Sequence, residues 1–203
     1  MKKILIFLAI ISFTIISCDK DESLNSNYKI TKYAVFEFNP EIKVAVGGPA
    51  FTPAAVAKID GAVIPFQVIG NVNTAVVGIY DVTYRAINED GYPAEAVQKV
   101  IVYDPSATGL DVSGLIVDAT RPARKGVITK VEGTNNIFFC TDFGLGGLFP
   151  MYFAMNGNNI VEISQVYPAG CTSVDLTYDP VTMRFTTFLN GPGLGYGYTF
   201  KYQ

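Results

Sequence analysis

The chain of 203 residues contains no histidine, no tryptophan and only three cysteines. Without histidine it cannot build a Ser-His-Asp or Cys-His catalytic site, and it lacks the commonest metal ligand. Cations are also scarce: 15 Lys and Arg stand against 18 Asp and Glu, for a net charge of −3. The one basic cluster comprises Arg121, Arg124 and Lys125. Because nucleic-acid binding needs many clustered cations, we expect no nucleic-acid partner.

The first eighteen residues carry the most specific signal in the sequence. Lys2 and Lys3 precede a largely apolar run of thirteen residues, Ile4 to Ile16. As a helix this run would span roughly 20 Å, too short for a bilayer core of about 30 Å, so it indicates an export signal. The segment that follows, Ile15-Ile16-Ser17-Cys18, resembles the lipobox of bacterial lipoproteins. The resemblance implies that residues 1–17 are removed and that Cys18 receives a lipid; the alternative is an ordinary cleaved signal with an incidental cysteine.

Residues 18–27 form a polar, acidic stretch without an apolar face, which predicts a tether between lipid and fold. Its start, Cys18-Asp19-Lys20-Asp21-Glu22, resembles the export signal of surface lipoproteins in Bacteroidota. That resemblance implies a protein held in the outer membrane by its lipid anchor and displayed on the cell surface. A periplasm-facing location is the alternative.

Residues 28–104 follow a period of two, which is typical of β-strands. Ala34, Phe36 and Phe38 form the predicted core face of the first strand, and a later strand is expected over Val63–Val68. Short strands separated by turn residues, with no amphipathic helix between them, predict a β-sandwich. The stretch from Val77 to Tyr103 resembles bacterial immunoglobulin-like (Ig-like) domains, with Tyr80 in the place of a tyrosine corner. A plain core role for Tyr80 is the alternative.

A second β-rich region, residues 110–203, follows the predicted linker Asp104–Gly109. About eight short strands are expected there, in a small antiparallel barrel or sandwich, so the predicted fold class is all-β throughout. The complete plan resembles Bacteroidota outer-membrane lipoproteins of the glycan-utilisation, starch-utilisation-like type. The resemblance implies a non-catalytic protein that binds an oligo- or polysaccharide or supports an outer-membrane transporter complex.

Two glycine-rich loops, residues 142–150 and 190–198, hold or border most of the aromatic side chains that could pack on sugar rings. The candidate ligand-binding residues are Phe149, Tyr152, Tyr167, Tyr196 and Tyr198. The alternative is that these glycines form tight turns and that the aromatic side chains fill the core. Neither loop has the Lys-Ser/Thr of a phosphate-binding loop, so nucleotide binding is not expected.

No metal site, cofactor or catalytic residue is predicted. Acid/base hydrolysis needs two carboxylates across a cleft, and the acidic residues of the C-terminal region are scattered. Cys140 and Cys171 could form one disulfide in an exported protein, or remain two separate buried thiols. The rival to glycan binding is a structural or adhesive protein that holds a protein partner through its Ig-like region.

Overall fold

The alternation of apolar and polar residues is realised as sixteen β-strands in a computed structural model that describes residues 30–203. Within these residues the only helical segment is a short 3-10 turn, Pro168–Gly170. The predicted all-β class is therefore confirmed. The predicted signal peptide (residues 1–17), Cys18 and nearly all of the sequence that precedes the first strand lie outside the described residues.

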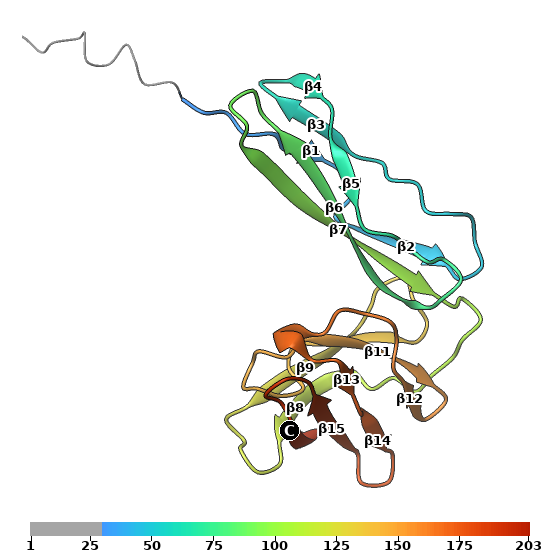
Figure 1. The fold of residues 1–203 in the computed structure, drawn as a ribbon. Helices are drawn as coiled ribbons and strands as arrows, with labels where there is room; N and C mark the ends of the chain where they lie inside the picture. The colour runs from blue at the N-terminus through green and yellow to red at the C-terminus, as the bar shows by residue number, and fades with distance from the viewer. Residues whose placement is uncertain (1–29) are drawn as a thin grey trace, which may run out of the picture. The chain divides into compact units, whose positions relative to one another are not determined.

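The strands of the N-terminal region form two sheets (Figure 1). One has three antiparallel strands in the order β1-β3-β4: β1 (Val35–Glu37), β3 (Val56–Ile59) and β4 (Ala62–Ile64). The other has the order β2-β7-β6-β5: β2 (Glu41–Ala45), β7 (Pro93–Tyr103), β6 (Gly78–Ile87) and β5 (Gln67–Ile69). β2 pairs with β7 in parallel, whereas the other pairs are antiparallel.

The two sheets enclose a core centred on Tyr84, whose side chain has no exposed surface. The rings of Phe36, Phe38 and Phe66 lie 5.3–6.3 Å from the Tyr84 ring. Its hydroxyl donates to the Gln98 side chain at 2.7 Å, which satisfies a polar group that would otherwise be costly to bury. Phe36 and Phe38 thus face the core, as the period of two predicts.

Tyr80 combines the two roles that its sequence context left open. Its hydroxyl donates to the Val76 carbonyl at 3.0 Å, four residues upstream, which is the bond expected of a tyrosine corner. Its ring also packs against the sandwich core. Assignment of this sandwich to the Ig-like family stays a prediction.

One expected strand is divided in the structure. The run Val63–Val68 was expected as a single strand, but Pro65 and Phe66 separate β4 from β5. Proline has no backbone N–H for the ladder, so the chain leaves one sheet there and enters the other. Phe66 fills the sandwich core between them.

The C-terminal region forms one nine-stranded sheet in the order β12-β11-β10-β9-β8-β16-β15-β13, with β14 paired to β15. Its strands are β8 (Gly114–Asp118), β9 (Lys125–Lys130), β10 (Ile137–Cys140), β11 (Met151–Asn156), β12 (Asn159–Val161), β13 (Ser173–Val174), β14 (Thr177–Asp179), β15 (Arg184–Asn190) and β16 (Tyr196–Tyr202). The sheet curls around a phenylalanine-rich core, Phe138, Phe143, Phe149, Phe153, Phe185 and Phe200.

A further cluster joins the sandwich to the curled sheet, and we call it the shared core. Its buried members come from both regions: Ile79, Ile101, Val131, Ile137, Ala154 and Ile163. Beside it, the Ile79 amide donates to the Ser164 carbonyl at 2.7 Å. The shared core therefore couples the two β regions through apolar burial and a backbone hydrogen bond.

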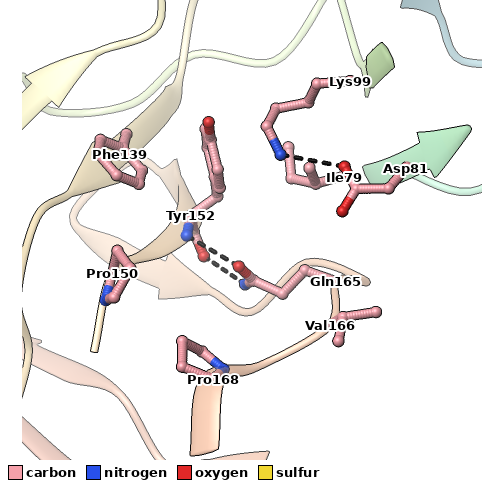
Figure 2. A pocket seen from close by; sticks show the side chains of 9 residues that line it. All are labelled: Ile79, Asp81, Lys99, Phe139, Pro150, Tyr152, Gln165, Val166 and Pro168. Carbon is pink, nitrogen blue, oxygen red and sulfur yellow. Dashed lines mark hydrogen bonds and ion pairs between the residues drawn. The ribbon is translucent and has the colours of Figure 1, made fainter. Parts of the chain in front are cut away.

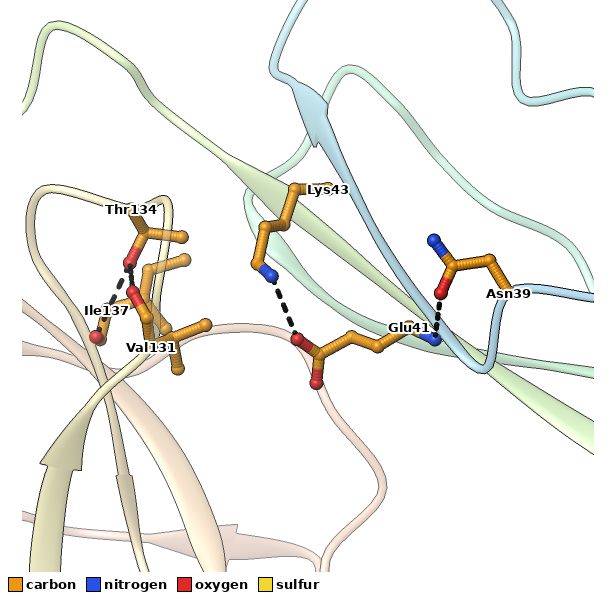
Figure 3. A network of polar contacts seen from close by, with 6 residues as sticks. All are labelled: Asn39, Glu41, Lys43, Val131, Thr134 and Ile137. Carbon is orange, nitrogen blue, oxygen red and sulfur yellow. Dashed lines mark hydrogen bonds and ion pairs between the residues drawn. The ribbon is translucent and has the colours of Figure 1, made fainter.

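The turn between β9 and β10 adds a second contact with the sandwich (Figure 3). Thr134 closes this turn by donating its hydroxyl to the Val131 carbonyl at 2.8 Å. The Lys43 side chain lies so close to Gly133 that a Cβ there would be 3.3 Å from its Cδ. Lys43 in turn pairs with Glu41 at 3.1 Å.

The segment between β7 and β8 is held by hydrogen bonds. The Asn135 side chain donates to the Pro105 carbonyl at 2.7 Å, and Leu110 N–H donates to the Gly157 carbonyl at 2.8 Å. The predicted division into domains 28–104 and 110–203 stays a prediction. Residues on both sides of the boundary contribute to the shared core.

Ile101→Ala tests this coupling, because Ile101 is fully buried in the shared core. We expect the free energy of unfolding to fall by about 2–5 kcal/mol. Urea unfolding followed through the amides of Val82 and Phe138, one in each region, should shift equally at both. Ile69→Ala is the control, since Ile69 is nearly half exposed. A shift at Val82 alone would contradict the coupling.

Candidate functional site

The five aromatic candidates do not share one groove. Phe149 has no exposed surface and stacks on Tyr167 at 6.3 Å, and Tyr198 is only 9% exposed. These two rings fill the core of the curled sheet, so they cannot serve as contact residues, which corrects the expectation. Tyr196 is 52% exposed, and Tyr152 and Tyr167 are half-buried.

The glycine-rich loop 142–150 is built around a buried carboxylate. Asp142 accepts hydrogen bonds from the N–H groups of Gly144 at 2.9 Å and Gly147 at 2.7 Å. At Gly147, φ is +97°, a conformation that L side chains rarely adopt. A Cβ at Gly144 would lie 2.9 Å from the Tyr198 ring. The glycines in this loop therefore serve a tight turn and close packing, as the alternative held.

Tyr167 is fixed by its neighbours. Its hydroxyl donates to Glu162 at 3.3 Å, and burial together with the Glu162 charge raises the pKa of Tyr167 to about 12. The phenol therefore stays protonated at neutral pH. One ring face packs on Phe149, which leaves this residue largely structural.

Tyr152 is the candidate that lies at a pocket (Figure 2). The cavity measures about 330 Å³, within the lower range for small-ligand sites. The sandwich and the curled sheet both contribute lining residues: Ile79, Asp81, Lys99, Phe139, Pro150, Tyr152, Gln165, Val166 and Pro168. The shared core lies beside it, so the packing that joins the two regions also positions the pocket walls.

A row of charges crosses three neighbouring strands on the sandwich side of the pocket. Glu41 of β2 and Asp81 of β6 both lie opposite Lys99 of β7 in the strand register. The Lys99 ammonium is 3.1 Å from the Asp81 carboxylate and 5.5 Å from the centre of the Tyr152 ring. Because Lys43 pairs with Glu41 and Lys99 pairs with Asp81, the charges around the row balance.

Gln165 holds Tyr152 from the other side. Its amide group donates to the Tyr152 carbonyl at 2.6 Å and accepts from the Tyr152 N–H at 2.9 Å. The side chain thus takes the place of a neighbouring strand where β12 stops pairing with β11. This explains why β12 ends at Val161.

The Tyr152 phenol is arranged to act as a hydrogen-bonding group. Its ring packs against Phe139 at 4.8 Å, and Figure 2 shows its hydroxyl pointing away from Gln165. Burial, followed by the charges of Glu41 and Asp81, raises the pKa of Tyr152. The hydroxyl consequently remains protonated at neutral pH. It also forms no hydrogen bond with any residue in the range 30–203. It is therefore free to donate to a ligand.

The two cysteines of this region are not bonded to each other. Both are free, buried thiols, and each donates to a nearby backbone carbonyl: Cys140 to Asp142 at 3.3 Å and Cys171 to Ser173 at 3.0 Å. Burial raises the pKa of the Cys140 thiol to about 12, so it is a poor nucleophile. The disulfide alternative is thus corrected to two separate thiols.

Residues 30–203 hold no cluster of three metal-ligating side chains. In the same range, no helix is long and apolar enough to cross a membrane.

Sequence reasoning missed most of the pocket. The alternation in β6 places Asp81 on the outward face of the sheet. Pairing β6 with β7 would then have identified Lys99 as its neighbour on that face. Gln165 and Pro150 carry no such signal, because their place at the pocket depends on how two distant regions meet.

No protein-family model and no curated protein matches this chain. Among solved structures, it is similar to a lipoprotein from Bacteroides thetaiotaomicron at 24% sequence identity. The match covers 84% of this chain and 100% of that chain, with a TM-score of 0.41. A likeness this low carries no inference about function.

Two buried carboxylates should affect stability in opposite directions as the pH falls. Burial raises the pKa of Asp142 despite its hydrogen bonds, so acidification toward the ordinary aspartate pKa of about 4 should stabilise the fold. Burial also opposes the charge of Asp118, but bonds from Thr120 and Arg121 outweigh it and lower its pKa. The stabilisation from Asp118 should therefore be lost below about pH 4.

Urea unfolding of Asp142→Asn and Asp118→Asn across this pH range measures both effects. Relative to wild type, the first variant should lose the gain above about pH 4, and the second should lose the decline below it. If both substitutions changed the pH dependence of the free energy of unfolding in the same direction, the opposite pKa shifts of Asp142 and Asp118 would be contradicted.

Proposed function

We propose that this chain is a non-catalytic lipoprotein, anchored in the outer membrane through Cys18 and exposed on the surface, that binds a saccharide at Tyr152. The N-terminal sequence supports the anchor. The observation that carries the binding proposal is the pocket, which brings Tyr152 together with the ion pair of Lys99 and Asp81 (Figure 2).

The chemistry of the pocket matches a neutral sugar. Sugar hydroxyls both donate and accept, so Asp81 can accept from one hydroxyl while Lys99 and Tyr152 donate to others. Pro150, Val166 and Pro168 provide apolar surface for the C–H groups of a sugar ring. Because both carboxylates of the row are paired with lysines, the row offers no unpaired cation to an acidic sugar.

The Tyr152 ring is not a free stacking platform. Phe139 packs against it and the Lys99 ammonium lies over it. Binding would therefore depend on the hydroxyl, the ring edge and the apolar walls. We expect an affinity suited to capture and release, as in support of an outer-membrane transporter complex.

A binding role fits this pocket better than hydrolysis. Asp81 is the one carboxylate among the nine lining residues, and Lys99 holds it at 3.1 Å. Acid/base cleavage of a glycoside needs a second carboxylate that can hold a proton. The ion pair instead suits the orientation of a polar ligand.

The rival function, a structural or adhesive protein, is favoured by one observation. Ile69 of β5 and Val97 of β7 both lie beside Thr83 on the outward face of the four-stranded sheet, and both are about half exposed. Apolar side chains on an exposed sheet face suit contact with a protein partner.

Tyr152→Phe tests the binding proposal by calorimetry against a panel of neutral polysaccharides. Loss of one hydrogen bond, about 0.5–1.5 kcal/mol, should weaken binding roughly 2- to 12-fold. Binding should change little with salt, because a neutral ligand has no charge to screen. Tyr196→Phe is the matched control, since Tyr196 is exposed and does not line the pocket. Absence of binding to every polysaccharide would favour the structural rival.

Cys18→Ala tests the anchor. The variant should leave the membrane fraction, because a lipoprotein is held by its acyl chains. Fractionation of cells with detergent partitioning would measure this, and unchanged partitioning would refute lipidation at Cys18.

A further inference from the structure

Four exposed side chains gather at one end of the sandwich, and we call them the tyrosine-valine patch. The rings of Tyr33 and Tyr92 lie 6.2 Å apart, and their side chains are 54% and 52% exposed. Val35 and Val63, which are 66% and 71% exposed, lie on either side of Lys58 in the strand register. Because large apolar side chains are costly to leave in water, such a group indicates a contact surface.

The patch lies where the sandwich begins. Tyr33 is two residues before β1, and Tyr92 directly precedes β7 at its turn with β6. Figure 1 shows the start of β1 on the same side of the sandwich as the β6–β7 turn. The patch is thus adjacent to the point where residues leading from Cys18 enter the fold.

Chain length limits how far the patch can be from the anchor. Cys18 and Tyr33 are 15 residues apart. At 3.3–3.6 Å per residue, even a fully extended chain would span no more than about 54 Å. The anchor therefore limits how far the patch can lie from the bilayer.

The chemistry of the patch matches the interface of a bilayer. Tyrosine places its ring at the level of the headgroups and keeps its hydroxyl in water. Lys58, between the two valines, can keep its ammonium in water while its aliphatic stem lies on apolar surface, and it pairs with Glu37 at 2.7 Å. This pairing leaves little charge to attract anionic lipids, so apolar contact is the expected attraction.

We propose that the tyrosine-valine patch is the membrane-facing surface of the anchored protein and rests on the lipid headgroups. The proposal builds on the lipid anchor of the proposed function. The proposal also determines where the pocket lies relative to the membrane. Ile87 and Pro93 mark the end of β6 and β7 next to Tyr92, and Asp81 and Lys99 lie six residues further along these strands. At 3.3 Å per residue this is about 20 Å, which would place the pocket away from the lipid.

A tryptophan probe tests the contact directly, because the natural chain has no tryptophan. The mature chain from Cys18, carrying Tyr92→Trp, is coupled through Cys18 to maleimide lipid in phosphatidylcholine vesicles. Cys140 and Cys171 are buried, so Cys18 is the reactive thiol. We expect the emission maximum to shift to shorter wavelength, and brominated phosphatidylcholine to quench most of the emission.

Tyr196→Trp, at an equally exposed position in the curled sheet, is the matched control and should show neither effect. Absence of the shift in Tyr92→Trp, or an equal shift in both variants, would overturn the proposal. A shift without vesicles that grows with protein concentration would assign the patch to a second copy of the chain and would overturn it too. Chemical coupling replaces cellular lipidation, so failure here is separable from failure of the Cys18→Ala test.

Discussion

The structure depends on one packing interaction: the shared core between the sandwich and the curled sheet. Ile79 and Ile101 extend from the outer face of the four-stranded sheet into a cluster with Ile137, Ala154 and Ile163. At roughly 25 cal/mol per Å² of apolar surface, such burial outweighs any single polar contact at the boundary. It also sets the distance between Lys99 and Tyr152, which belong to different regions.

The pocket follows from where this burial ends. Along β6 and β7 the outward residues change from isoleucine to the Asp81–Lys99 pair, and the apolar contact gives way to a polar cavity. On the other side, Gln165 satisfies the backbone of Tyr152 where no strand continues. A site with converging polar groups therefore arises at a boundary that both regions must form anyway.

The features that the sequence predicted correctly depend on residues close together in the chain. The period of two identified the core-facing side of Phe36 and Phe38, and Tyr80 forms a bond back to the chain, at Val76, as a tyrosine corner would. The same alternation could not predict which face of a strand is covered by distant parts of the chain. It therefore left open whether an aromatic candidate fills the core, as Phe149 does, or lines a pocket, as Tyr152 does.

Contacts distant in sequence account for the rest. The parallel pairing of β2 with β7 places Glu41 beside Lys99, although 58 positions separate them, and no short-range pattern predicts it. The loop 142–150 looked suited to a ligand because of its glycines, but the buried carboxylate of Asp142 explains them. Both backbone N–H groups that Asp142 binds lie within its own loop, so this carboxylate serves the turn.

The most direct test of the shared core is hydrogen exchange at the amide of Ile79. This N–H donates to Ser164 in the other region, so its protection depends on the two regions staying together rather than on pairing within β6 and β7. The account predicts that it exchanges as slowly as the core amides of β6. Exchange at the rate of an exposed amide, with Val82 still protected, would contradict it.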